Sequence, residues 1–150
     1  MEDIVLECLR EVFEIETPFS SFLNIKVLPD ENRQPYLFME MQDVCIGNYM
    51  QNILHGGIIS TLLDIAGAVV AMESTLSKIS NHPKQEMMKK FEKLGTIDMR
   101  VDFLRPGRGR YFVAKGEIMR MGNKISVTRT ELRNDENTLI AVGTGTYMVG

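Results

Sequence analysis

The sequence predicts an α+β fold in which one antiparallel sheet, of about five to six strands, wraps around a long central helix. The longest apolar run of the 150-residue chain is Ile53–Met72, which suits a buried helix. Residues 96–149 alternate apolar and polar side chains between short turns, as consecutive antiparallel strands do. The whole order is short helix, two strands, long helix and four strands, and we expect one domain over residues 1–150.

The N-terminal third predicts a helix followed by a hairpin. Residues 2–15 carry apolar side chains at helical spacing with acids between them, which predicts an amphipathic helix. This helix ends before Pro18, because a residue that precedes proline avoids the α region. Asn24–Leu28 and Tyr36–Met41 are separated by turn residues and predict two paired strands. Cys45–Asn52 is expected to be an irregular loop that leads into the central helix.

The central helix is expected at about residues 55–75 and has two faces. Larger apolar side chains that can pack on a sheet occupy one face, namely Ile58, Leu62, Ile65, Val69 and Met72. Small or polar residues form a second stripe, namely Gly57, Ser60, Thr61, Asp64, Gly67, Ala68 and Ala71. A glycine inside a helix costs up to about 1 kcal/mol relative to alanine, so a close backbone contact is expected at Gly67. That contact is made either with a second copy of the helix or with the chain's own core.

The C-terminal half begins with the polar segment Ser74–Leu94, which is longer than a plain connection needs and is expected to cover or border a site. Pro83 and Gly95 predict the start and end of a short helix at about residues 84–94. The apolar side chains of the next strand, Thr96–Leu104, are expected to face the central helix, namely Ile97, Met99, Val101 and Phe103. Hairpin turns separate three further strands, namely Tyr111–Met121, Ile125–Asn134 and Thr138–Val149.

The composition excludes several classes of protein. The chain is 44% hydrophobic and 25% charged with a net charge of -3, which gives no support for nucleic acid as a partner. The two cysteines lack CxxC spacing, so we expect neither a zinc site nor a disulfide framework, and a reducing, cytoplasmic location fits. Membrane insertion is not expected, because Asp64 near the bilayer centre would cost about 2.5–3.5 kcal/mol. The N-terminus also lacks the features of a signal peptide.

The start of the central helix, at His55-Gly56-Gly57, predicts a site that polarises a carbonyl group. The first N–H groups of a helix have no acceptor within it and lie at the positive end of its dipole. Glycine lets a ligand approach this backbone, so the Gly56 N–H could stabilise an oxyanion. His55 is expected to order the helix start. Its only companion is His82, and no metal site is expected.

Asp64 is the only acid in the apolar run and is the candidate general base or nucleophile. A buried carboxylate bonded to neighbouring backbone is the alternative. Gly56 and Asp64 are eight residues apart in the sequence, roughly 12 Å along one helix. One helix therefore cannot bring both to a single carbonyl group. If both act, two copies of the chain must contribute, so the spacing predicts a symmetric dimer.

Three arginines, Arg105, Arg108 and Arg110, cluster in one turn, where they would suit either a bound anion or plain solvent exposure.

The motif Leu54-His55-Gly56-Gly57, followed by Leu63-Asp64, resembles the signature of PaaI-type acyl-CoA thioesterases, in the hotdog-fold superfamily of 4-hydroxybenzoyl-CoA thioesterase. Residues 96–107 and the turn 121–124 carry the resemblance into the C-terminal half. Residues 46–48, with 53–57, are similar to the bacterial YigI-like branch.

The resemblance implies a hotdog fold, paired into dimers and dimers of dimers, that hydrolyses a medium- or long-chain or aromatic acyl-CoA. Coenzyme A is part of the substrate, and no cofactor is implied. Gly56 would donate its N–H to the thioester oxygen, Asp64 of the partner chain would activate water or attack directly, and Thr96 would orient the water. Either Asn48 or Asn52 would face the thioester. The candidate substrate-binding residues are Gly57, Asn52, Thr61, Arg105, Arg108, Gly122, Asn123 and Lys124.

Two questions stay open from the sequence: whether Thr96 can reach Asp64, and whether the protein catalyses a reaction. Thr96 shares a strand face with Asp98, opposite Ile97, so it reaches Asp64 only if its strand starts irregularly.

A non-catalytic acyl-CoA or acyl-chain binding protein on the same fold is a second hypothesis. A β-hydroxyacyl thioester dehydratase, with His55 and Asp64 as its histidine and acid, is a third and fits less well. Loss of hydrolysis in an Asp64→Asn protein would distinguish the thioesterase from the binding protein.

Overall fold

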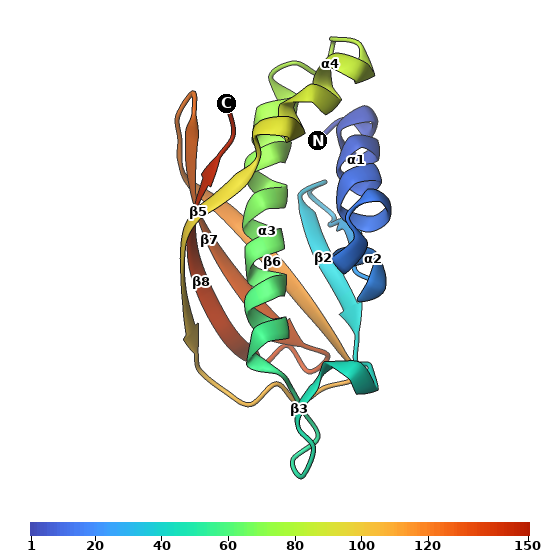
Figure 1. Ribbon diagram of the computed structural model, residues 1–150, viewed down its shortest axis with the longest axis vertical. Helices are drawn as coiled ribbons and strands as arrows, with labels where there is room; N and C mark the ends of the chain where they lie inside the picture. Colours follow the sequence, from blue (N-terminus) through green and yellow to red (C-terminus); the bar gives the residue numbers. More distant parts are fainter.

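The computed structural model describes all 150 residues and shows a six-stranded antiparallel sheet curled around one long helix, α3 (Gly56–Ser77) (Figure 1). The order of strands across the sheet is β1-β2-β6-β7-β8-β5. The strands are β1 (Lys26–Pro29), β2 (Pro35–Glu40), β5 (Gly95–Phe103), β6 (Tyr111–Met121), β7 (Ile125–Asn134) and β8 (Leu139–Met148). The predicted sheet around one helix and the predicted order of these elements are confirmed.

The N-terminal segment packs against α3 and β1 (Figure 1). Helix α1 (Asp3–Arg10) continues into a π-helical turn, Glu11–Glu16, and α2 (Pro18–Phe22) follows with the proline in its first turn. Val5 and Leu9 are fully buried on one face of α1, as the apolar spacing of this segment requires. The predicted amphipathic helix is therefore present, with a wider final turn.

Residues 45–54 differ from the prediction. A short 3-10 helix (Asp43–Cys45) leads into a small hairpin of β3 (Ile46–Asn48) and β4 (Ile53–Leu54), which lies beside the start of α3 (Figure 1). The main chain is held from both sides, because the Leu54 N–H donates to the Gly107 carbonyl (2.9 Å) and the His55 N–H to that of Cys45 (2.8 Å). The central helix therefore begins at Gly56, and the first residues of the apolar run form strand β4.

Helix α3 lies very close to the sheet at Gly67. A Cβ atom at Gly67 would overlap the hydroxyl of Tyr147 on β8 and lie 2.7 Å from Oγ1 of Thr128 on β7. Ala68 and Ala71 are also buried within the chain. The small-residue stripe thus serves the chain's own core at these positions, and of the two alternatives for the close contact at Gly67 the chain's own core is the one observed.

The apolar length of α3 has a core function. Its most hydrophobic 18-residue window has a mean hydropathy of 1.5, long and apolar enough for a membrane span. Within the fold, however, the helix fills the hollow of the sheet, with Leu62, Leu63, Val69 and Met72 at 0–1% exposure. The window is therefore explained by packing inside the chain.

The insertion after α3 folds back over the N-terminal segment. It contains α4 (Lys84–Lys89) and a 3-10 turn (Lys90–Lys93), close to the predicted short helix. The ring of Phe91 contacts that of Phe13 edge to face, with centroids 6.0 Å apart. The Lys84 ammonium lies 2.7 Å from the Glu11 carboxylate, so the insertion is fixed to the N-terminal segment by packing and by charge.

A Gly145→Ala substitution is expected to lower the free energy of unfolding by about 1–3 kcal/mol, as overpacked cores do. A Cβ atom there would lie 2.6–2.8 Å from three atoms of the buried Tyr147 side chain. Gly95→Ala is the matched strand control, because nothing lies within 4 Å of its Cβ position. Urea unfolding of the two variants measures the difference, and equal stability of both would contradict this packing.

Candidate active site

Asp64 is held by two different elements at once. It lies in the third turn of α3 and is half-buried. The Thr96 hydroxyl of β5 donates to its carboxylate Oδ1 at 2.8 Å. The Tyr147 hydroxyl of β8 donates to its main-chain oxygen at 2.9 Å. Its second carboxylate oxygen, Oδ2, makes no hydrogen bond within the chain and is free to accept one from a ligand or water.

Thr96 reaches Asp64 because β5 contains a β-bulge. Thr96 pairs with Tyr147 and Asp98 pairs with Thr146, so Ile97 is an extra residue that has no partner on β8. The alternation of side chains shifts by one position at this bulge. Thr96 therefore turns toward α3, and Ile97 turns outward with 53% of its surface exposed. The expectation that Ile97 covers the central helix is wrong for the same reason.

Tyr147 was not among the predicted site residues. Burial, and secondly the negative charge of Asp64, raise the pKa of its phenol well above the usual range, so it remains a neutral hydrogen-bond donor. The sequence holds one signal for it. Gly143, Gly145 and Tyr147 alternate on β8 and face α3, and a run of glycines on one face of a strand marks a close approach of backbone.

The N-terminus of α3 presents one free N–H group. The imidazole Nδ1 of His55 accepts the Gly57 N–H at 2.8 Å, and the His55 carbonyl accepts that of Ile58 at 2.9 Å. No acceptor in the chain contacts the Gly56 N–H. It opens on a cleft of about 380 Å³, whose apolar wall includes the Phe103 ring at the end of β5. The predicted role of His55 in ordering the helix start is confirmed, since it is the N-cap residue.

The Asp64 carboxylate lines a second pocket, of about 350 Å³, between the N-terminal segment, α3 and the start of β5. Apart from Asp64 and Thr96, its lining residues are Phe13, Thr17, Phe19, Ser20, Thr61, Ile65, Ala68, Leu94 and Gly95. This lining is mostly apolar, and Asp64 is its only charged residue. One chain thus holds an isolated N–H donor and a carboxylate in two separate cavities.

Known sequences and structures place the chain in a family. Residues 51–141 match the family described as the Thioesterase superfamily. The chain belongs to this superfamily. It is 41% identical to the medium/long-chain acyl-CoA thioesterase YigI of Escherichia coli over 145 aligned residues. The aligned region covers 97% of this chain and 94% of that protein.

Two solved structures share the fold. A Shewanella oneidensis protein related to the thioesterase superfamily has a TM-score of 0.87 and 41% identity, covering 97% of this chain and 95% of that one. The Escherichia coli PaaI protein has a TM-score of 0.74 at 17% identity, covering 98% of this chain and 94% of that one. The hotdog fold and the resemblance to PaaI-type, YigI-like thioesterases are confirmed.

Within this hotdog chain, the loop candidates near the helix start have structural partners. The Asn48 carboxamide accepts the Met50 N–H (3.1 Å) and so caps the β3–β4 turn. Asn52 has a positive φ of 52°, a conformation that asparagine tolerates. The Arg108 guanidinium donates to the Gln51 carbonyl at 2.7 Å, which ties the hairpin to the arginine-rich turn.

The remaining candidates are spread over the hotdog chain. Thr61 lines the Asp64 pocket, but its hydroxyl donates to the Gly57 carbonyl at 2.9 Å. Arg105 donates to the Leu139 carbonyl at 2.9 Å. Residues 122–124 form the β6–β7 turn beside the C-terminus, at the opposite end of α3 from its first residue (Figure 1). A single chain therefore does not bring this turn to the Gly56 cleft.

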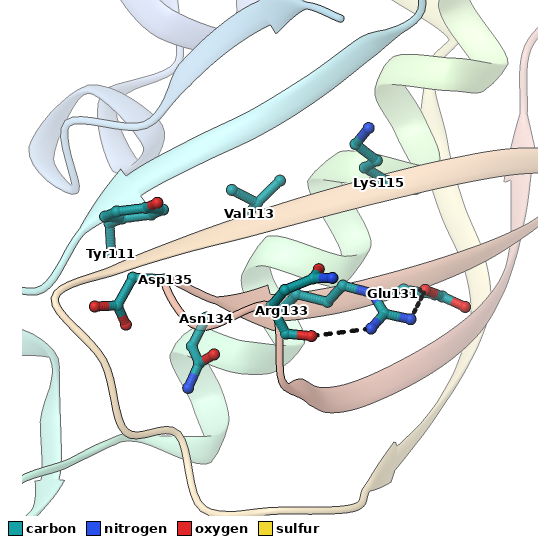
Figure 2. A pocket seen from close by; sticks show the side chains of 8 residues that line it. Tyr111, Val113, Lys115, Glu131, Arg133, Asn134 and Asp135 are labelled. Carbon is teal, nitrogen blue, oxygen red and sulfur yellow. Dashed lines mark hydrogen bonds and ion pairs between the residues drawn. The ribbon is translucent and has the colours of Figure 1, made fainter.

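A further hollow, of about 220 Å³, lies on the outer face of the hotdog sheet (Figure 2). Its lining residues are Tyr111, Val113, Lys115, Glu131, Arg133, Asn134, Asp135 and Asn137. On β6 these residues alternate with Phe112 and Ala114, which are buried toward α3. The Arg133 guanidinium already donates to the Glu131 carboxylate at 2.9 Å. This hollow thus faces away from Asp64, and the positive charge of Arg133 within it is already paired with the carboxylate of Glu131.

A His55→Ala substitution is expected to lower the free energy of unfolding by about 1 kcal/mol, because the Gly57 N–H loses its cap. His55→Asn supplies another side-chain acceptor at the N-cap and should keep most of the stability. Thermal and urea unfolding of both variants test this, and an alanine variant as stable as the asparagine variant would show that the cap contributes nothing.

Proposed function

We propose that this chain is an acyl-CoA thioesterase that hydrolyses medium- or long-chain or aromatic acyl-CoA at a site shared by two copies. Thioester hydrolysis itself is the activity of its superfamily and of its YigI relative, and the chain is a thioesterase enzyme. The observation that carries the proposal is the hydrogen bond from Thr96 to Asp64, made inside an apolar pocket with one carboxylate oxygen left free.

In the proposed reaction, the free Oδ2 of Asp64 removes a proton from a water molecule that attacks the thioester carbon. Thr96 holds the carboxylate in place through Oδ1 and so fixes the direction of Oδ2. The thioester oxygen, as it becomes negative, accepts the Gly56 N–H at the positive end of α3. Collapse of this intermediate breaks the C–S bond, and the proton held by Asp64 passes to the departing sulfur, which releases the thiol of coenzyme A and the free acid. The mechanism needs no cofactor.

Two copies of the chain would complete this site. Gly56 and Asp64 are about 12 Å apart along α3. Strand β5 is an unpaired edge of the sheet and contacts both half-sites, with Thr96 at Asp64 and Phe103 beside Gly56. Phe103 is 56% exposed, as suits a residue that a partner covers. A second copy antiparallel along this edge would bring the Thr96 end of one strand toward the Phe103 end of the other.

Assembly and location follow from the same proposal. We propose a homodimer that pairs further into a dimer of dimers, which would give the β6–β7 turn and the arginine-rich turn access to the coenzyme A of a neighbouring site.

A cytoplasmic location is proposed because both cysteines, Cys8 and Cys45, are free thiols. Burial raises the pKa of each thiol, which makes neither a candidate nucleophile.

Asp64→Asn is expected to lower kcat for acyl-CoA hydrolysis by about 10²–10⁴-fold, the usual contribution of a general base. Thr96→Val, which removes the hydroxyl at similar size, should lower kcat by about 10–100-fold through a misdirected carboxylate. Thr96→Ser keeps the donor and is the matched control. Free-thiol detection on a panel of acyl-CoA substrates measures each rate, and wild-type turnover in Asp64→Asn would rule out the mechanism.

Gly56→Pro is expected to abolish most of the turnover while leaving the helix intact. Proline lacks the N–H but suits the first residue of a helix, and His55 before it already has the extended ψ of 136° that proline favours. Gly56→Ala keeps the N–H, and its Cβ would make an ordinary contact with the Phe103 ring at 3.4 Å. It should therefore remain active.

Mixed dimers extend this test to the shared site. Chains carrying Gly56→Pro and chains carrying Asp64→Asn are coexpressed with different tags, and the mixed dimer is isolated. One of its two sites then receives an intact Gly56 and an intact Asp64, so about half of the wild-type activity should return. A mixed dimer as inactive as its parents would place both groups within one chain's site.

A further inference from the structure

The pocket that holds Asp64 extends along α3 rather than stopping at the carboxylate. Thr61, Asp64, Ile65 and Ala68 all line it, and these positions recur at one-turn spacing on a single face of the helix. From Thr61 to Ala68 the face is about 10 Å long. The pocket therefore has room for an elongated group on the far side of the reacting carbonyl.

The walls of this pocket suit an uncharged chain. Phe13, Phe19, Ile65 and Leu94 contribute apolar surface, and no lining residue other than Asp64 is charged. A nucleotide or a pyrophosphate would find no cation there. An aliphatic acyl chain, in contrast, would replace water at these side chains with favourable burial.

The wall opposite α3 comes from the N-terminal segment and the insertion. Phe13 is only 6% exposed and is locked by the edge-to-face contact with Phe91, so it forms a fixed surface. Phe19 lies one helix further along the chain, on α2, and is 52% exposed, which places it at the open side of the pocket. Phe13 is thus a fixed wall of the pocket, and Phe19 lies where the pocket opens to solvent.

We propose that the N-terminal segment and α3 together determine acyl-chain length, with Phe13 and Ala68 limiting the depth of the pocket and Phe19 covering the bound chain. This inference rests on the proposed thioesterase function. It assigns the substrate as an unbranched aliphatic acyl-CoA. The residues that set the preference lie outside the His-Gly-Gly and Asp64 machinery.

The test compares kcat/KM over saturated acyl-CoA substrates of increasing length, and over benzoyl-CoA, for the full chain and its variants. Ala68→Leu should lower kcat/KM for the longest substrates by about 10-fold or more relative to the shortest, because a few methylene groups in a pocket discriminate by that amount. Phe13→Leu should shift the optimum toward longer chains. Circular dichroism and thermal unfolding verify that each variant folds.

A matched pair on α2 supplies the control. Phe19→Ala should raise KM for long-chain substrates, whereas Phe22→Ala should leave the profile unchanged, because Phe22 is equally an exposed phenylalanine (62%) but does not line the pocket. An unchanged length profile in folded Ala68→Leu and Phe13→Leu would overturn the inference, as would a wild-type preference for benzoyl-CoA.

The failure of the proposed function would be visible separately. If the wild-type chain hydrolyses no substrate, the proposed function fails, and calorimetric binding of the same acyl-CoA series still decides the inference. Ala68→Leu should then weaken binding of long-chain acyl-CoA by about 10-fold or more and leave short-chain binding unchanged. Equal weakening at every length would reject the pocket as the site that measures the chain.

Discussion

The contact on which the rest of the structure depends is the one between Tyr147 and the middle of α3. The phenol donates to the main-chain oxygen of Asp64, and its ring fills the space that Gly67 and Gly145 leave open. Because the bond is made to the backbone, it fixes the position of the helix and leaves the carboxylate free for other partners. The raised pKa of the buried phenol keeps it a neutral donor at physiological pH.

Strand β5 places side chains beside both Asp64 and the start of α3. As an edge strand it can accommodate an extra residue, and the bulge at Ile97 turns Thr96 toward the carboxylate. The same strand ends with Phe103 against the start of α3. One irregular strand therefore positions a side chain at each of the two cavities. Its outer edge has no partner within the chain, so the strand that contributes to both cavities is also the one with an edge open to pairing.

Most of the fold was predictable from the sequence because apolar side chains recur at regular helical or strand spacing over long segments. The bulge was not, because the apolar alternation from Ile97 onward is unbroken and only the pairing with β8 reveals the extra residue. Strand β4 is too short to show a period and depends on a hydrogen bond from Leu54 to a distant turn. The small-residue stripe fitted either a second helix or the chain's own core, and only the position of Tyr147 decides between them at Gly67. Gly56 and Asp64 could be proposed because their chemistry is local to α3.

The choice of a histidine as the helix cap carries a chemical consequence. Serine, threonine or aspartate would accept the Gly57 N–H equally well. An aspartate at this position, however, would place a negative charge beside an oxygen that becomes negative during attack, and so would oppose its stabilisation. The Nδ1 of His55 accepts the second N–H as an uncharged group, and the His55 carbonyl accepts the third. The helix end is thereby reduced to one unpaired donor at Gly56. The carboxylate of Asp64 lies two turns further along α3, roughly 12 Å from that donor, so a reaction that used both groups on one carbonyl would need a second copy of the chain to bring them together.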